Sequence, residues 1–326
     1  MREALASILR APGTGAPLSL EVTARDGDDV SEGALRSGAE SWPVVRGVPR
    51  FVSSDNYAQT FGFQWNRFPG TQLDSVSGMT VSRDRFLAQW AMPPEWFAGR
   101  RLLDVGCGAG RFAEVALSLG AEVVAVDLSA AVDACWQSLR AHPRLHVVQA
   151  SVYDLPFAPG SFDGVYSFGV IQHTPDVPRT FRAIVEMARP GGEVAVDVYK
   201  SDWKSWLHPK PWLRPVTTRV PADVLFSLIE RTAPALLAVS RVVGRVPVAG
   251  RALRRAIPVA DYEGVLPVDD RQRLEWAVLD TFDWLSPRYD QPQTRETLRR
   301  WAEDAGLVDI QTLHPAHLTL RARRPG

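Results

Sequence analysis

The stretch of residues 101–129, RLLDVGCGAGRFAEVALSLGAEVVAVDLS, constrains the fold more than any other part of the chain. Its first residues form a short apolar run that is typical of a buried parallel strand. The run breaks into Gly106, Gly108 and Gly110, where the backbone must turn tightly and can approach a ligand. Apolar residues at helical spacing follow, and a second apolar run ends in Asp127. The stretch therefore predicts a strand, a glycine-rich turn, a helix and a strand, which is half of a nucleotide-binding fold.

The spacing of the glycines distinguishes between two classes of cofactor. Dinucleotide-binding enzymes carry G-x-G-x-x-G, whereas the glycines here alternate and Asp104 lies two residues before the first of them. The pattern resembles motif I of the class I S-adenosylmethionine (SAM) dependent methyltransferases. The resemblance implies an α/β fold with a Rossmann-like, seven-stranded sheet and an antiparallel terminal strand. It also implies SAM as the cofactor and S-adenosylhomocysteine as the product.

The composition of the chain favours a small molecule as the partner. Lys and Arg number 37, as do Asp and Glu, so there is no overall basic field of the kind that attracts nucleic acid. The only cysteines, Cys107 and Cys135, are too few for a disulfide framework and fit a reducing cytoplasm. No apolar run approaches the ~20 residues of a membrane span. We expect a cytoplasmic protein that has no nucleic-acid partner and is not stably inserted in a membrane.

The N-terminal segment is expected to be a small β-rich module, because short apolar runs alternate with Gly and Pro. Its layout resembles the zinc-ribbon module that precedes some bacterial methyltransferase domains. That module has cysteines where this chain has Ala11 and Thr14, and a second pair near Ser37 and Glu40. Because a structural zinc site of this type needs thiolates, we predict a degenerate ribbon that binds no metal.

We divide the chain into five segments, according to where it resembles the family and where one long insertion departs from it. The expected segments are the ribbon-like module at 1–54, a linker with N-terminal helices at 55–100, the SAM-binding core at 101–199, an acceptor-lid insertion at 200–287, and the C-terminal part of the core at 288–326.

The resemblance also assigns the cofactor site residue by residue. It implies that the glycine turn holds the methionine portion of SAM, that Asp127 holds the ribose, and that Leu128 lies against the adenine. Ser151 stands where the family commonly has an acidic residue or Asn, so we also assign the adenine contact to the Val152 backbone. The full set of expected cofactor contacts is Asp104, Gly106, Cys107, Gly108, Gly110, Asp127, Leu128, Ser151, Val152 and Phe168.

His173 is the candidate catalytic residue. It lies in the segment 172–176, just after an expected fourth strand at 161–171, and the carboxyl ends of parallel strands are where α/β folds keep their chemistry. With an ordinary pKa near ~6.5, an imidazole can take the proton of a hydroxyl as the methyl group transfers. The alternative is a loop residue beside SAM, since similar Q-H-T stretches occur in family members with different acceptors.

Three segments supply candidate acceptor contacts. The aromatic stretch 56–68 is either a linker helix packed on the core or a flap over the site. The end of the fifth strand, expected at 193–199, and the segment 277–290 place charge, aromatic faces and hydroxyls near the same edge. The residues expected to touch the acceptor are Gln64, Trp65, Asp197, Tyr199, Asp283, Trp284 and Tyr289.

The insertion at 200–287 begins with tryptophans and prolines and continues as helix-like segments at 222–229 and 233–243. Its place after the fifth strand suggests a lid over the acceptor. The tryptophans and a basic patch at 250–257 leave open that the lid rests on a membrane surface, because aromatic and arginine side chains suit the interface.

The sequence therefore predicts a SAM-dependent methyltransferase that acts on a small molecule. O-methylation of a natural product or sugar in secondary metabolism is the first expectation. Alternatives are C-methylation of an isoprenoid or quinone-like acceptor and a SAM-binding protein without transfer activity. A nicotinamide oxidoreductase is opposed by the glycine spacing.

Overall fold

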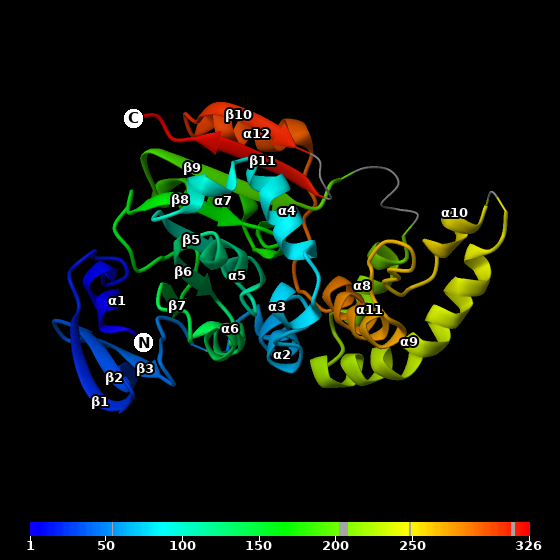
Figure 1. Ribbon diagram of the computed structural model, residues 1–326, viewed down its shortest axis with the longest axis horizontal. Helices are drawn as coiled ribbons and strands as arrows, with labels where there is room; N and C mark the ends of the chain where they lie inside the picture. Colours follow the sequence, from blue (N-terminus) through cyan, green and yellow to red (C-terminus); the bar gives the residue numbers. More distant parts are fainter. Residues whose placement is uncertain (54, 202–207, 248, 314–316) are drawn as a thin grey trace.

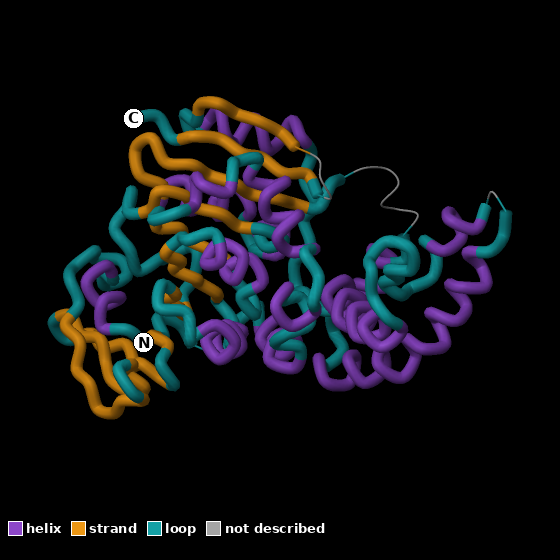
Figure 2. Tube along the Cα trace, in the orientation of Figure 1, coloured by secondary structure: helices purple, strands orange, loops and turns teal. Residues whose placement is uncertain are grey.

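The computed structural model describes residues 1–53, 55–201, 208–247, 249–313 and 317–326. Figure 1 shows a large central sheet with helices on both faces, a small sheet near the N-terminus and a group of helices at the other end of the molecule. The strands form two separate groups in Figure 2, which correspond to these two sheets.

The large sheet confirms the predicted fold class. Its seven strands are ordered β10-β11-β9-β8-β5-β6-β7, and β11 runs antiparallel to both of its neighbours. Strands β5 to β9 are mutually parallel where they pair, so their carboxyl ends share one edge. The strands are β5 (Arg101–Val105), β6 (Glu122–Asp127), β7 (Leu145–Gln149), β8 (Phe162–Ser167), β9 (Ala188–Val198), β10 (Val308–Leu313) and β11 (Leu318–Arg323).

Side chains alternate between the two faces of this sheet and build two cores. In β5, Leu102 packs with the helices of one face, whereas Leu103 and Val105 belong to the core on the other face. One face is covered by α4 (Val81–Trp90), α5 (Arg111–Ser118) and α6 (Ala131–Leu139). The other is covered by α7 (Val177–Met187), α12 (Arg295–Asp304) and the N-terminal module.

The N-terminal module contains the predicted strands and one helix that the sequence analysis did not expect. Its elements are α1 (Glu3–Ile8), β1 (Ser19–Asp26), β2 (Asp29–Ser37), β3 (Glu40–Val45) and β4 (Val48–Pro49). Val30, Leu35 and Val44 are fully buried and join the core of the large sheet, so the module is packed on the rest of the protein. Within the described residues, no three His, Cys, Asp or Glu side chains are grouped as metal ligands.

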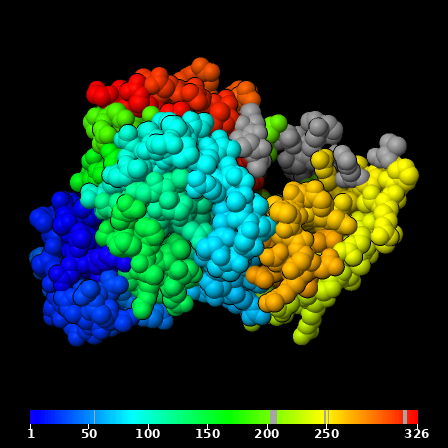
Figure 3. Space-filling model, viewed as in Figure 1, coloured from blue at the N-terminus to red at the C-terminus, as the bar shows by residue number. Residues whose placement is uncertain are grey.

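The helical group at the right of Figure 1 is built from the insertion. It contains α8 (Lys210–Thr217), α9 (Ala222–Gly244), α10 (Gly250–Arg254) and α11 (Asp270–Leu285). A separate hydrophobic core joins α9 and α11, and α2 (Gln59–Arg67) packs Phe63 on Phe226 of that core, with ring centroids 5.6 Å apart. In Figure 3 the segment at 55–95 lies between the central domain and this helical group, which we call the lid.

Two short elements complete the connection between the N-terminal module and the sheet, namely α3 (Asp74–Ser77) and the 3₁₀ helix η1 (Pro94–Phe97). The tryptophans Trp203 and Trp206 of the insertion lie outside the described residues. Among the helices of the described ranges, none is both long and apolar enough to cross a membrane.

Two predictions about the lid and the sheet edge were wrong. The segments predicted at 222–229 and 233–243 form the single helix α9. Pro234 has no N–H to donate to the backbone carbonyl four residues earlier, but it lies on the exposed side of the helix, where water can hydrogen-bond to that carbonyl instead. The predicted strand at 161–171 ends at Ser167, because Gly169 turns the chain at φ 79° before the 3₁₀ helix η2 (Ile171–His173).

The boundary between α7 and β9 also differs from the prediction. The helix ends at Met187, and the strand begins at Ala188 rather than at Glu193. Phe162 pairs with Ala188 and Gly164 with Glu193, so the Pro190-Gly191-Gly192 segment bulges within the strand instead of only ending the helix.

A nearly buried ion pair joins the N-terminal module to α6. Asp133 accepts hydrogen bonds from Arg50 at 2.7 Å and from Arg46 at 2.9 Å, and the Arg50 side chain is only 11% exposed. Asp133→Asn should lower the free energy of unfolding by about 3 kcal/mol, because it leaves the Arg50 charge unpaired. Asp26→Asn removes an exposed partner of Arg140 and should cost less than about 1 kcal/mol. Equal losses for both variants in denaturant titrations would contradict this account.

Candidate functional site

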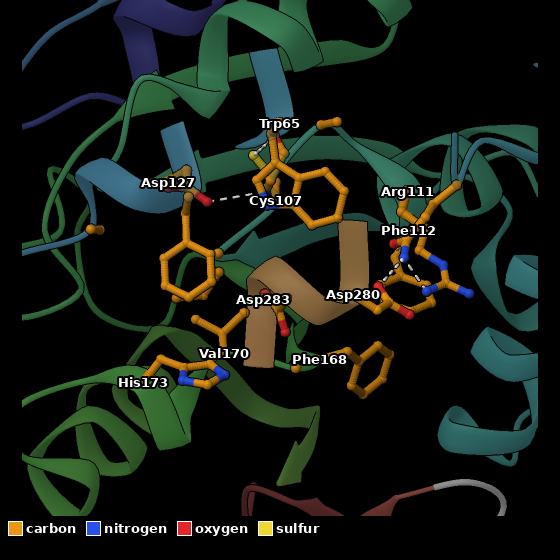
Figure 4. Close-up of a pocket in the computed structure, with 18 of the residues that line it drawn as sticks. Trp65, Cys107, Arg111, Phe112, Asp127, Phe168, Val170, His173, Asp280 and Asp283 are labelled. Atoms are coloured by element: carbon orange, nitrogen blue, oxygen red, sulfur yellow. Dashed lines mark hydrogen bonds between the residues drawn. The ribbon is translucent and has the colours of Figure 1, made fainter. Parts of the chain in front are cut away.

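A cavity of about 420 Å³ opens at the carboxyl ends of the parallel strands. Its walls come from the glycine turn after β5, from the ends of β6, β8 and β9, from α2, and from α11 of the lid (Figure 4). Segments that are far apart in the sequence therefore meet around one hollow, as the shared edge of parallel strands predicts.

The glycine turn is fixed by the neighbouring strand. The amides of Gly106 and Cys107 both donate to the Val126 carbonyl, at 2.7 and 3.0 Å. Gly106 has φ 84°, and a Cβ on it would lie 2.5 Å from a methyl carbon of Val170. Only glycine fits there, so the turn stays close to the floor of the cavity.

Asp127 ties the turn to the end of β6. One carboxylate oxygen accepts the Gly108 amide at 3.0 Å, and the other accepts the amide and hydroxyl of Ser129 at 2.8 and 2.7 Å. Burial raises the pKa of this carboxyl above its ordinary value, while these hydrogen bonds act in the opposite direction. Because a carboxylate has about four lone-pair sites and three are occupied, Asp127 keeps capacity to accept one more hydrogen bond, from a ribose hydroxyl in the cavity that it lines.

The rest of this end of the cavity fits SAM. Leu128 and Val152 line it beside Asp127 and offer apolar surface to an adenine ring. The backbone of the glycine turn is exposed to the cavity at Gly106 and Gly108, and Cys107 and Phe168 also line it. Trp65 covers the turn, since a Cβ on Gly108 would lie 3.1 Å from the indole nitrogen.

Three expected cofactor contacts lie outside the cavity lining. Asp104 is buried beneath the turn, and burial raises its pKa to about 8, so it is mainly protonated at neutral pH. A Cβ on Gly110 would lie 2.6 Å from a carbon of Leu139, so this glycine allows close helix packing. The Ser151 hydroxyl accepts the Tyr153 amide at 3.2 Å.

His173 also lines the cavity, and its ring has a defined tautomer. Its Nδ1 lies 2.9 Å from the Tyr289 carbonyl oxygen, which can only accept a hydrogen bond. Nδ1 therefore carries the proton and Nε2 is the basic nitrogen. Burial lowers the pKa of His173, and within the described residues Nε2 has no hydrogen-bond partner. The ring is held between Phe61 and Tyr199, each with its centroid 5.4 Å away.

Tyr199 and Asp283 lie beside this imidazole. The Tyr199 hydroxyl donates to an Asp283 oxygen at 3.1 Å, which joins the end of β9 to the lid. Lys210 lies over the Tyr199 ring with Nζ 4.4 Å from its centroid and pairs with Asp290 at 2.9 Å. Burial raises the pKa of Tyr199 well above its ordinary value, so this hydroxyl remains a donor at neutral pH.

One face of α11 forms the roof of the cavity. Trp276, Asp280, Asp283 and Trp284 all line it, and their spacing of i, i+4, i+7 and i+8 places them on one side of the helix. Asp280 accepts a hydrogen bond from the Tyr262 hydroxyl, and burial raises the pKa of Asp280 to about 6. The sequence analysis missed Trp276 and Asp280, although their spacing from Asp283 and Trp284 was a signal that could have found them.

Two arginines on the cavity wall were also missed. Arg111 follows the glycine turn directly and lies over Phe112 and Trp276, 5.1 and 5.6 Å from their centroids. Burial lowers its pKa to about 10, which still leaves it charged at neutral pH. Arg85 of α4 lines the same wall, and a charged residue on an amphipathic helix gave no signal of this role in the sequence.

The remaining expected acceptor contacts lie behind the lining. Asp197 is buried and accepts hydrogen bonds from Arg85, Gln89 and the Gly169 amide, so its carboxylate is occupied. Gln64 is buried, and its side-chain amide has no partner among the described residues. The Tyr289 ring packs edge-on against Tyr57 with centroids 5.5 Å apart, so this residue contributes its carbonyl to His173.

Comparison with known proteins agrees with this geometry. Residues 103–196 match the family model described as a methyltransferase domain. The chain is 37% identical over 150 residues to a ubiquinone biosynthesis O-methyltransferase of Xanthomonas campestris pv. campestris (strain B100), a match that covers 43% of this chain and 61% of the relative. A protein of the same name from Azoarcus sp. (strain BH72) is 32% identical over 120 residues, with 34% of this chain and 48% of the relative covered.

A solved S-adenosylmethionine-dependent methyltransferase from Mesorhizobium loti is 19% identical, with a TM-score of 0.42, and the match covers 74% of this chain and 96% of the other.

The chain spans 61% of the length of the first of these relatives. The matched segment runs from β5 into β9 and contains the glycine turn, Asp127 and His173. The chain thus carries a class I SAM-dependent methyltransferase domain.

Proposed function

We propose that this protein transfers the methyl group of SAM to a hydroxyl oxygen of a small-molecule acceptor. The observation that carries the proposal is the His173 imidazole, which is neutral and lines the same cavity as Asp127, and whose buried, basic Nε2 has no hydrogen-bond partner in the described part of the chain. A hydroxyl loses a proton when it is methylated, so a base at the far end of the cofactor cavity is the group that O-methylation requires.

The cofactor end of the cavity orients the donor. SAM supplies a methyl group on a sulfonium, which is already a good leaving group. Asp127 accepts a hydrogen bond from the ribose, Leu128 and Val152 enclose the adenine, and the glycine turn lies along the methionine portion. Trp65 and the α11 roof exclude water and restrict the approach of the acceptor, and such alignment supplies much of the rate enhancement in transfer reactions.

The other end positions the acceptor and removes its proton. The acceptor hydroxyl donates its hydrogen bond to Nε2 of His173 and passes its proton there as the oxygen–methyl bond forms. The Tyr289 carbonyl fixes the ring through Nδ1 and stabilises the imidazolium that results. Asp283, held by Tyr199, accepts a hydrogen bond from a second hydroxyl of the acceptor.

The roof favours an acceptor that has a ring and more than one hydroxyl. Trp276 and Trp284 offer flat faces for stacking, and Asp280 and Asp283 lie between them as hydrogen-bond acceptors. A natural product or a sugar has this chemistry. The name of the relatives, ubiquinone biosynthesis O-methyltransferase, supports O-methylation and adds a hydroxylated quinone-type ring to the acceptors to be tried.

Asp127→Ala tests the cofactor site. The variant should bind SAM at least about tenfold more weakly in calorimetric titration, because it loses a charge-assisted hydrogen bond to the ribose. It also removes the acceptor that holds Gly108. Asp304→Ala, at an exposed position of α12, is the matched control and should bind as the unaltered protein does. Unchanged affinity of the Asp127 variant would refute the assignment.

His173→Ala tests the base. Turnover should fall by about 10²–10⁴, while SAM affinity stays within a few fold, because the imidazole lies at the acceptor end. Formation of S-adenosylhomocysteine is the measurement, with hydroxylated aromatic, sugar and quinone-type acceptors offered in parallel. His142→Ala, outside the cavity lining, should retain full activity. Unaltered turnover in the His173 variant would remove the base from the mechanism.

The pH profile gives a separate test. The neutral imidazole is the active form, so turnover should decline as pH falls through the pKa of His173, which burial places below the ordinary ~6.5. Asp280 has a pKa of about 6 and titrates in a similar range, so the profile of Asp280→Asn distinguishes the two groups. The acidic decline should persist in that variant. If it disappears there, Asp280 rather than His173 controls the rate.

A further inference from the structure

The lid exposes an unusual amount of apolar surface. Of the twelve large hydrophobic residues that are exposed in the described part of the chain, nine lie between Trp212 and Leu253. Single exposed apolar residues are common on proteins, but a cluster on one element usually marks an interaction surface.

Helix α9 carries the main part of this surface. Val224, Leu228, Val239 and Val242 are 54%, 57%, 51% and 64% exposed. Ala235 is exposed as well and lies between Leu228 and Val239 in the sequence. The five residues are spaced by four, seven, four and three positions, so they lie along one side of the helix. We call these five residues the outer stripe.

The outer stripe is distinct from the face that holds the lid together. Leu225, Phe226 and Ile229 of the same helix are buried in the lid core against α11. Helix α9 is therefore apolar on two sides, and packing among the described residues accounts for only one of them.

Positive charge accompanies the outer stripe. Residues 208–258 contain nine Lys and Arg but only two Asp and Glu, and four of the nine, Lys210, Arg214, Arg241 and Arg254, pair with acidic residues of the segment 261–290. Arg231 and Arg245 are exposed on α9 and directly after it, and Arg255 is exposed after α10. One of the two acidic residues, Glu230, is already paired with Arg67 at 3.4 Å. The partner of this surface should therefore be apolar and negatively charged.

We propose that the outer stripe and its arginines dock the lid on a bilayer that contains anionic phospholipid. Apolar side chains beside arginines on a helix that lies in the interface gain both acyl-chain burial and attraction to anionic headgroups. A second copy of the chain fits less well, because apposing two such surfaces would bring two clusters of arginine together. The long axis of α9 lies along the outer edge of the molecule in Figure 1, where a flat surface can reach it.

Docking would place the cavity close to the membrane. Helix α9 packs on α11, and another side of α11 forms the cavity roof. The docking itself is independent of the methyl transfer, so it can be tested on the cofactor-free protein.

Vesicle flotation of the full chain tests the proposal. The protein should float with vesicles of equal parts phosphatidylcholine and phosphatidylglycerol, and much less with phosphatidylcholine alone or at about 0.5 M salt. The variant L228E/V239E/V242E and the charge variant R231E/R245E should each lose at least about tenfold in vesicle partitioning. Val308→Glu, an exposed position on β10, should bind as the unaltered protein does.

All substituted positions are exposed, and SAM affinity reports that each variant is folded. The proposal is overturned if the unaltered protein does not float with anionic vesicles, or if both variants float as it does. It is equally overturned if sedimentation shows a dimer that the L228E/V239E/V242E variant dissociates while vesicle binding is absent, since a second copy then covers the stripe.

Discussion

The contact between the Asp127 carboxylate and the glycine turn is the constraint on which the rest of the site depends. The Gly108 amide and both donors of Ser129 hold this side chain at the end of β6, and the turn after β5 is held in return. These hydrogen bonds fix the position of the Asp127 side chain at the wall of the cavity. Because β5 and β6 are central in the parallel part of the sheet, both its cores support this contact.

The helices α9 and α11 of the lid, which pack on each other, present two different surfaces. Helix α11 directs tryptophans and carboxylates into the cavity, and α9 supports it from behind while presenting an apolar, basic surface outward. A change on the outer surface thus lies two helices away from the acceptor.

The sequence predicted what local patterns determine. Alternating glycines, short apolar runs and an amphipathic C-terminal helix were enough for the sheet, because each depends on residues that are adjacent in the chain, and the cofactor contacts stay a prediction. The acceptor end depends on long-range packing, and there the prediction was incomplete. Arg85 lines the cavity from α4, a helix that precedes the core in the sequence. Asp197 accepts hydrogen bonds from Arg85 and from the Gly169 amide and does not line the cavity. Neither placement has a local signature.

The central claim is that SAM binds across the carboxyl ends of β5 and β6 with its reacting end toward His173. A crystal structure with S-adenosylhomocysteine tests this most directly. We predict a ribose hydroxyl at about 3 Å from the Asp127 carboxylate, the adenine between Leu128 and Val152, and the sulfur on the side of His173. A product bound elsewhere in the molecule, or in this cavity with its ribose directed away from Asp127, would contradict the account.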